Sequence, residues 1–197
     1  MKHLMIALLA VASFSLVARA EDPPLGQEIY PLTLGHRWTY RIQGQDDRLT
    51  IQVVAIDMIN GVRCYRLEGK IQNRVIATEH VAKLKDGLYR YRNEGIDIDP
   101  PLLLCKFPVE KGDAWKAEYK HNEKKASLRY ECDLEEVTVL HGKYQSVVIH
   151  SITADNSKLK NSVWYAPRIG MVKQVIEEGE QTIVLTLERF DRGFEKK

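Results

Sequence analysis

Cysteine is scarce in this sequence: the chain of 197 residues contains only Cys64, Cys105 and Cys132. Three cysteines can form at most one intramolecular bridge, which excludes a small domain held together by disulfides. No Cys-x-x-Cys pair occurs, so zinc binding and thioredoxin-like redox chemistry lack their motif. Period-two alternation places Cys105 and Cys132 on inward faces and Cys64 on a polar face. This pattern favours a Cys105–Cys132 disulfide, and three free thiols are the alternative.

Motifs of enzymes and metal sites are missing as well. The sequence has no G-x-S-x-G elbow, no phosphate-binding loop and no dinucleotide-binding glycine pattern. The histidines that follow residue 20 are too scattered for metal-ligand spacings: His36, His80, His121, His141 and His150. Asp97-x-Asp99 lacks the further oxygen ligands of a calcium loop, so we interpret it as a solvated acidic loop. A Cys64–histidine nucleophile is left open, but we predict a non-catalytic protein without metal or cofactor.

Long hydrophobic runs are absent after the first twenty residues. The run Leu4–Ala18 is too short to span a membrane and ends at Ala18-Arg19-Ala20, a small-x-small cleavage pattern. The sequence therefore predicts a secretory signal over 1–20, cleaved after Ala20, and an exported protein of the periplasm or extracellular space. No cysteine lies at the cut, so a lipid anchor is not expected. No later segment is long and apolar enough to span a membrane, so an integral membrane protein is not expected either.

Charge of one sign is not in excess either. Removing Lys2 and Arg19 with the signal reduces the 29 basic residues to 27, equal to the 27 acidic residues. A balanced surface argues against nucleic acid as a partner, because nucleic acid binding needs a basic stripe. No linker divides the rest of the chain. We predict a lead-in segment over 21–29, one domain over 30–192 and a loose tail over 193–197.

Helical periodicity is rare, and period-two alternation dominates. In the segment 125–135 the apolar side chains alternate with polar ones: Leu128, Tyr130, Cys132 and Leu134. The alternation changes phase after Glu135-Glu136, which suggests a β-bulge or a bend there. Turn pairs such as Asn60-Gly61 and Asp86-Gly87 separate at least ten such segments and are strong hairpin signals. The sequence predicts an all-β fold, a curled antiparallel meander that forms a half-barrel or a barrel-like sheet with little helix.

One nine-residue pattern occurs twice, as YPLTLGHRW at 30–38 and FPVEKGDAW at 107–115. In each copy a proline after an aromatic residue favours an extended approach. Gly35 and Gly112 then fit turn positions that need a positive φ. Trp38 and Trp115 open the next strand. We interpret the pattern as two equivalent corners that lay an aromatic side chain on the sheet, and a pair of tryptophans in a ligand groove is the alternative.

The segments YPLTLGHRWTY (30–40) and VWYAPRIGMVKQV (163–175) resemble a family of exported bacterial proteins of unknown function. In that family Y-P-L-x-x-G-x-x-W-x-Y opens the domain and W-Y-A-x-x-[IV]-G-x-[VI]-K closes it. The resemblance implies an all-β curled sheet, broadly like lipoprotein-carrier and lipocalin-like half-barrels. It carries no catalytic residues. This chain departs from the pattern at Arg168, where a glycine is common in the hairpin turn.

Aromatic residues supply the remaining candidates for ligand-lining or core positions: Trp38, Tyr40, Tyr89, Tyr91, Trp115, Tyr130 and Trp164. In GLYRYRN (87–93) one face is aromatic and the other is basic, which predicts core packing or an aromatic wall around an apolar ligand. Two functions therefore remain open. The first is a cell-envelope protein that binds a lipid, a lipidated peptide or another apolar ligand on its concave face. The second is an interaction module with a filled core that contacts another envelope protein; an envelope hydrolase has no motif to support it.

Overall fold

A computed structural model describes residues 26–153 and 159–193 as one closed antiparallel barrel. The elements follow in order: η1 (Gln27–Ile29), β1 (Arg37–Ile42), β2 (Arg48–Ile59), β3 (Val62–Ile71), β4 (Arg74–Leu84), β5 (Gly87–Asn93), β6 (Ile96–Lys106), β7 (Ala114–His121), β8 (Lys124–Val139), β9 (Gly142–Thr153), β10 (Leu159–Ala166), β11 (Gly170–Glu178) and β12 (Gln181–Asp191). The predicted signal over 1–20, most of the lead-in and the tail from 194 lie outside the described residues.

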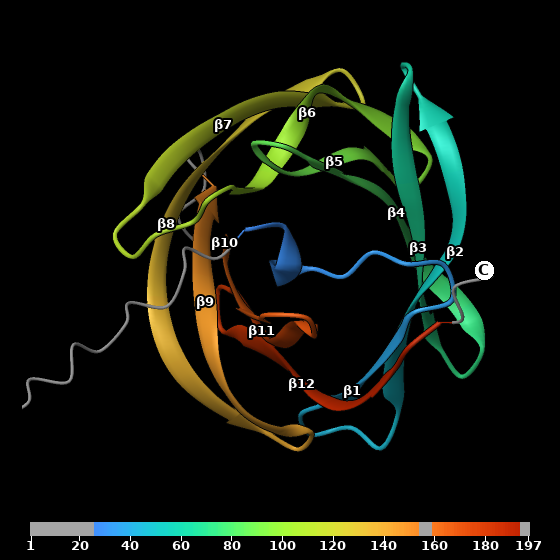
Figure 1. The fold of residues 1–197 in the computed structure, drawn as a ribbon, viewed down its shortest axis with the longest axis vertical. Helices are drawn as coiled ribbons and strands as arrows, with labels where there is room; N and C mark the ends of the chain where they lie inside the picture. The colour runs from blue at the N-terminus through green and yellow to red at the C-terminus, as the bar shows by residue number, and fades with distance from the viewer. Residues whose placement is uncertain (1–25, 154–158, 194–197) are drawn as a thin grey trace, which may run out of the picture.

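The strands form a meander in which each pairs with its neighbours in the chain, and β1 closes the ring against β12 (Figure 1). Six consecutive residues of β1 pair with β12, from Arg37 opposite Asp191 to Ile42 opposite Leu185. The prediction of an all-β antiparallel fold is confirmed, and the predicted curled sheet closes into a complete barrel. Closure removes the exposed strand edges that an open sheet would leave for aggregation.

The repeated nine-residue pattern forms two matching corners. Gly35 and Gly112 have φ angles of 85° and 84°, as the sequence predicts. The N–H of Gly35 donates to the carbonyl of Val53 on β2 (2.8 Å), and the N–H of Gly112 donates to the carbonyl of Cys132 on β8 (2.9 Å). Each corner therefore attaches the start of a strand to the strand after it, and the second corner lies midway around the barrel.

Aromatic side chains fill one end of the barrel. Figure 1 shows η1 lying inside the ring of strands rather than outside it. Tyr30 follows η1 and packs on Trp38, with ring centroids 5.3 Å apart. The indole of Trp38 donates to the carbonyl of Ile169 (2.6 Å), and the hydroxyl of Tyr40 donates to that of Met171 (2.9 Å). The β10–β11 turn and the lead-in therefore plug this end together.

Arg168, the departure from the family pattern, has a φ of 63° in the β10–β11 turn. Its backbone N–H donates to the carbonyl of Glu28 (2.8 Å), and its guanidinium pairs with the Glu28 carboxylate (2.9 Å). Arg168 thus adopts the left-handed backbone conformation, which glycine adopts without steric cost. Its contacts hold the lead-in against the turn.

Two sequence predictions about strands need correction. Of the two alternatives at Glu135-Glu136, the bulge is wrong, because the register of β8 with β9 is unbroken from Leu128 to Val139. The buried side of β8 changes because the hairpin bends over the barrel end, where the N–H of His141 donates to the carbonyl of Leu187 on β12 (3.0 Å). The acidic segment is also not a loop. Asp97 and Asp99 lie within β6, and Asp97 forms an ion pair with Arg92.

Candidate functional site

The barrel encloses an inner cavity of about 200 Å³. Half of the residues that line it are apolar: Ile51, Val81, Leu88, Leu102, Leu104, Leu128, Ile149, Val163 and Met171. The others are polar: Tyr30, Glu79, Arg90, Tyr119, Tyr130, Ser151, Asn161, Tyr165 and Gln174. Most binding sites for small molecules have mainly apolar walls with a few polar groups, and this cavity is more polar than that.

An ion pair between Glu79 on β4 and Arg90 on β5 is the charged centre of the cavity. The Nε and Nη2 groups of Arg90 both lie 2.7 Å from Oε2 of Glu79. Burial alone would lower the pKa of Arg90, but the charge and hydrogen bond of Glu79 outweigh it and the pKa is raised. The side chains keep 31% and 25% of their surface accessible, and this surface faces the cavity. Nη1 of Arg90 and Oε1 of Glu79 take no part in the pair.

Four tyrosines surround this ion pair: Tyr30, Tyr119, Tyr130 and Tyr165. Burial raises the pKa of each phenol, and the nearby Arg90 charge lowers it in part. Within residues 26–153 and 159–193, the four hydroxyls form no hydrogen bond to another protein group. They also keep surface exposed, because none is among the fully buried atoms without a partner. Their hydrogen-bonding capacity is therefore available to a ligand or to water.

A second polar group lies on β9, β10 and β11. The amide of Gln174 donates to the side-chain oxygen of Asn161 (2.8 Å), and the hydroxyl of Ser151 donates to the backbone carbonyl of Asn161 (3.3 Å). These contacts engage one polar atom each of the Gln174 and Asn161 side chains, and the hydroxyl of Ser151. The ion pair, the tyrosines and the remaining amide atoms are the polar groups that a ligand could contact.

The predicted aromatic residues occupy three kinds of position. Tyr130 lines the cavity, and Trp115 stacks on it with centroids 4.9 Å apart and an interplanar angle of 9°. Trp38 and Tyr40 are fully buried at the barrel end that the lead-in and the β10–β11 turn fill. The others face away from the cavity: Tyr89, Tyr91 and Trp164. Trp164 donates to Glu135 (2.8 Å) and lies under the Lys173 ammonium at 4.5 Å.

Sequence reasoning missed the central residues of the site. In GLYRYRN the inward face carries Leu88 and Arg90, and the aromatic face points outward. Tyr91 instead packs in a separate small cluster with Ile59, Cys64 and Ala82. The spacing of Trp115 and Tyr119, which puts them on one face of β7, was the available signal for Tyr119.

All three cysteines are free and buried in the structure. The predicted Cys105–Cys132 disulfide is therefore absent, and the three thiols are free. The predicted placement of Cys64 on a polar face is wrong, because Cys64 is buried in the small cluster with Ile59, Ala82 and Tyr91. Burial raises the pKa of the Cys64 and Cys132 thiols to about 11, and it raises that of Cys105 further. His80 pairs with Asp57 (2.9 Å). In the described part of the chain, no three histidine, cysteine or acidic side chains come together as metal ligands.

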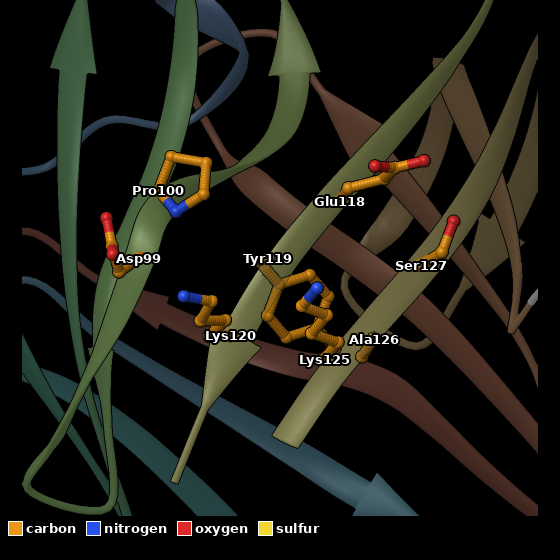
Figure 2. A pocket seen from close by; sticks show the side chains of 8 residues that line it. All are labelled: Asp99, Pro100, Glu118, Tyr119, Lys120, Lys125, Ala126 and Ser127. Atoms are coloured by element: carbon orange, nitrogen blue, oxygen red, sulfur yellow. The ribbon is translucent and has the colours of Figure 1, made fainter. Parts of the chain in front are cut away.

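A second pocket, of about 440 Å³, lies at the seam between β6 and β7. The residues around it come from β6, β7 and β8: Asp99, Pro100, Glu118, Tyr119, Lys120, Lys125, Ala126 and Ser127 (Figure 2). We call it the seam pocket. The β6–β7 ladder comprises only Ile98 opposite His121 and Asp99 opposite Lys120. Tyr119 lines both the seam pocket and the inner cavity, so the two share a wall.

Comparisons with known proteins give the fold and little else. No protein-family model and no curated protein matches the chain. A solved structure of a "putative lipoprotein" from Parabacteroides distasonis aligns with a TM-score of 0.50 and 10% identity, over 85% of this chain and 99% of that one. A "putative exported protein with YmcC-like fold" from Bacteroides fragilis aligns with a TM-score of 0.48 and 13% identity, over 83% and 98%. At 10% identity, the first likeness shows a shared fold only. No helix among the described residues is long and apolar enough to cross a membrane.

Proposed function

We propose that this protein is an exported, non-catalytic binding protein whose inner cavity holds a small amphiphilic ligand. The observation that carries the proposal is that four tyrosines line the same cavity as the Glu79–Arg90 pair, while their hydroxyls have no hydrogen-bond partner among the described residues. Half of the residues around them are apolar. A filled core would satisfy such polar groups or replace them with apolar ones. Export is supported by the signal-like segment over 1–20 and by the fold shared with the "putative lipoprotein" of Parabacteroides distasonis.

The size and lining of the cavity define the ligand class. An apolar cavity of about 150 Å³ holds a benzene molecule, so a cavity of about 200 Å³ has room for a short hydrocarbon segment. A purely hydrocarbon ligand would leave the hydroxyls and the ion pair without hydrogen-bonding partners, which costs free energy. The ligand therefore combines a short apolar part with at least one polar group.

The first test is calorimetric titration of the protein with octanol, a neutral amphiphile of suitable length. We expect binding that the Val163→Phe substitution weakens at least tenfold, because the larger ring occupies the cavity. Ile76→Phe is the matched control: Ile76 is 54% exposed, so this substitution adds the same ring away from the cavity and leaves binding unchanged. Thermal unfolding of each variant checks that it is folded. Failure of the wild-type protein to bind any amphiphile of this length, or equal binding by Val163→Phe, contradicts the proposal.

A second test identifies the natural ligand. The protein is expressed with its own signal segment, purified without detergent and weighed by native mass spectrometry. We expect a reproducible adduct that organic solvent releases and that the Val163→Phe variant lacks. A bare mass across several preparations would instead favour an interaction module with a filled core.

A further inference from the structure

The wall of the barrel is incomplete at one seam. β6 and β7 pair at two positions, whereas β1 and β12 pair at six. Pro100 and Pro101 follow Asp99, the last residue of β6 that pairs with β7. Proline has no backbone N–H to donate to a ladder. Past the prolines, two side-chain contacts hold the seam together. The Trp115 indole donates to the carbonyl of Leu103 (3.4 Å), and Lys106 pairs with Asp113 (2.9 Å).

The seam pocket occupies the part of this gap between the short ladder and the side-chain contacts. Figure 2 shows Asp99 and Pro100 on one side of it and Glu118, Tyr119 and Lys120 on the other. Tyr119 faces inward with Trp115 and is half-buried, and it forms the wall shared with the inner cavity. Movement of this one ring would join the two spaces. The lead-in plugs one barrel end, and the seam pocket adjoins the cavity that holds the ion pair through the wall formed by Tyr119.

The mouth of the seam pocket carries an unusual pair of charges. Lys120 of β7 lies directly opposite Lys125 of β8 in the register. Like charges placed directly opposite one another across two strands are destabilising. Three other lysines near the seam pair with carboxylates: Lys106 with Asp113, Lys111 with Asp133 and Lys116 with Glu118.

The acidic residues of the pocket offset this pair only in part. Glu118 pairs with Lys116, which lowers the pKa of Glu118, and the charge of Lys125 adds a smaller lowering. Asp99 is the register partner of Lys120, but over the described residues neither Lys120 nor Lys125 forms an ion pair. A bound anion would relieve the repulsion between the two ammonium groups. The apolar surfaces of Pro100, Tyr119 and Ala126 lie beside them for an attached hydrocarbon chain.

We infer that the ligand of the inner cavity is an anionic amphiphile that enters between β6 and β7. Its acidic head group lies at Lys120 and Lys125, and its apolar part passes Tyr119 into the cavity. This inference rests on the proposed function, because it assigns the head-group charge and the route of the same ligand. Carboxylate and phosphate head groups share the chemistry that two lysines recognise.

The head-group experiment compares octanoate, octanol and octyltrimethylammonium, which have equal chains and different charges, by calorimetric titration. The wild-type protein is expected to bind octanoate most tightly. The double variant Lys120→Gln/Lys125→Gln is expected to bind octanoate roughly twofold to thirtyfold more weakly, a range set by two exposed ion pairs. Its affinity for octanol should not change. The control Lys85→Gln/Lys143→Gln removes two exposed lysines from the β4–β5 turn and from β9, and it should behave as wild type.

The entry experiment measures the association rate of octanoate by stopped-flow tryptophan fluorescence. Tyr119→Ala removes the ring between the two spaces and should accelerate association severalfold. Tyr119→Phe keeps the ring and should leave the rate as in wild type. Equal rates in all three proteins overturn entry through the seam.

The outcomes separate the two proposals. If octanol and octanoate bind equally, and the double lysine variant loses nothing, the anionic head group is wrong while the binding cavity stands. If none of the three amphiphiles binds the wild-type protein, the proposed function fails, and this inference fails with it. Preferred binding of octyltrimethylammonium also overturns the anionic head group.

Discussion

The indole N–H of Trp115 donates a hydrogen bond of 3.4 Å to the backbone carbonyl of Leu103 and so joins β7 to β6 where their backbones do not pair. The same ring stacks on Tyr130, a wall of the inner cavity. At this seam a side-chain hydrogen bond therefore links two strands that backbone hydrogen bonds link elsewhere in the barrel. The seam can open by the loss of a few contacts, which is a local and inexpensive motion.

We predict that Trp115→Phe weakens the seam without unfolding the barrel. The phenyl ring keeps the stacking on Tyr130 but lacks the N–H group, so the loss should be about 1 kcal/mol of unfolding free energy. Amide hydrogen exchange over 102–106 should accelerate more than the loss of global stability explains. Trp164→Phe is the control, because it removes the hydrogen bond to Glu135. This variant should lower stability and leave exchange in β6 unchanged relative to the rest. Equal exchange patterns in the two variants would contradict the role of Trp115.

The corners of the fold could be predicted from the sequence because their cause is local. A positive φ at Gly35 and Gly112 follows from the spacing of proline, glycine and tryptophan within nine residues. The inward face of β5 could not be predicted in this way. Both of its faces carry side chains that can be buried, and alternation alone does not say which one turns inward. Arg90 was therefore taken as part of an outer basic face, and the site centred on it was missed.

Long-range pairing also limits what the sequence reveals. Cys105 and Cys132 alternate correctly for an inward position, but a bridge depends on the separation of their backbones, which only the fold fixes. The incomplete seam has a local signal, the Pro100-Pro101 pair. Which strand these prolines face is again a property of the closed barrel.

Gly112→Ala should cost about 1–2 kcal/mol of unfolding free energy, since an L side chain is strained at a φ of 84°. No atom lies within 4 Å of the added methyl group, so the cost comes from the backbone alone. Gly112→Asn is the matched control, because asparagine adopts the left-handed region more readily than alanine. Urea denaturation of both variants measures the difference. Equal stabilities would show that the corner tolerates an ordinary residue.

Breaking the Glu79–Arg90 pair from one side should be more damaging than removing it altogether. Arg90→Met leaves the Glu79 carboxylate in the cavity without its partner, which should cost about 3 kcal/mol of unfolding free energy. The double variant Glu79→Leu/Arg90→Met leaves no unpaired charge and should recover most of that loss. Urea denaturation measures both. A double variant as unstable as the single one would mean that the pair itself stabilises the fold.

The thiols should be unreactive in the folded protein. Cys64, Cys105 and Cys132 are 0%, 1% and 5% exposed, and burial raises the pKa of each above its ordinary value of 9.0. Because the thiolate is the reactive species, Ellman's reagent should label none of them at pH 8 and all three in urea. The intact mass should equal that of the fully reduced chain. A deficit of two hydrogens would restore the predicted disulfide and contradict the structure.

Stability should fall as the pH rises above the ordinary tyrosine pKa of 10.0. In the folded barrel, burial raises the pKa of Tyr30, Tyr119, Tyr130 and Tyr165, so these phenols stay protonated while those of the unfolded chain ionise. The folded state then binds more protons than the unfolded state, and the free energy of unfolding decreases with pH. The stabilisation is complete below pH 10 and is lost progressively above it.

The buried thiols act in the same direction from about pH 9, since their pKa values are also raised by burial. Urea denaturation at pH 8, 9, 10 and 11 measures the effect, with Tyr130→Phe as the comparison. That variant lacks one phenol whose pKa is raised. Above pH 10, the slope of its unfolding free energy against pH should therefore be shallower by about 1.4 kcal/mol per pH unit. Tyr130 also faces the ligand, so the titration is done without amphiphile. A slope that does not differ between the variant and wild type would mean that Tyr130 is not shielded from water in the folded cavity.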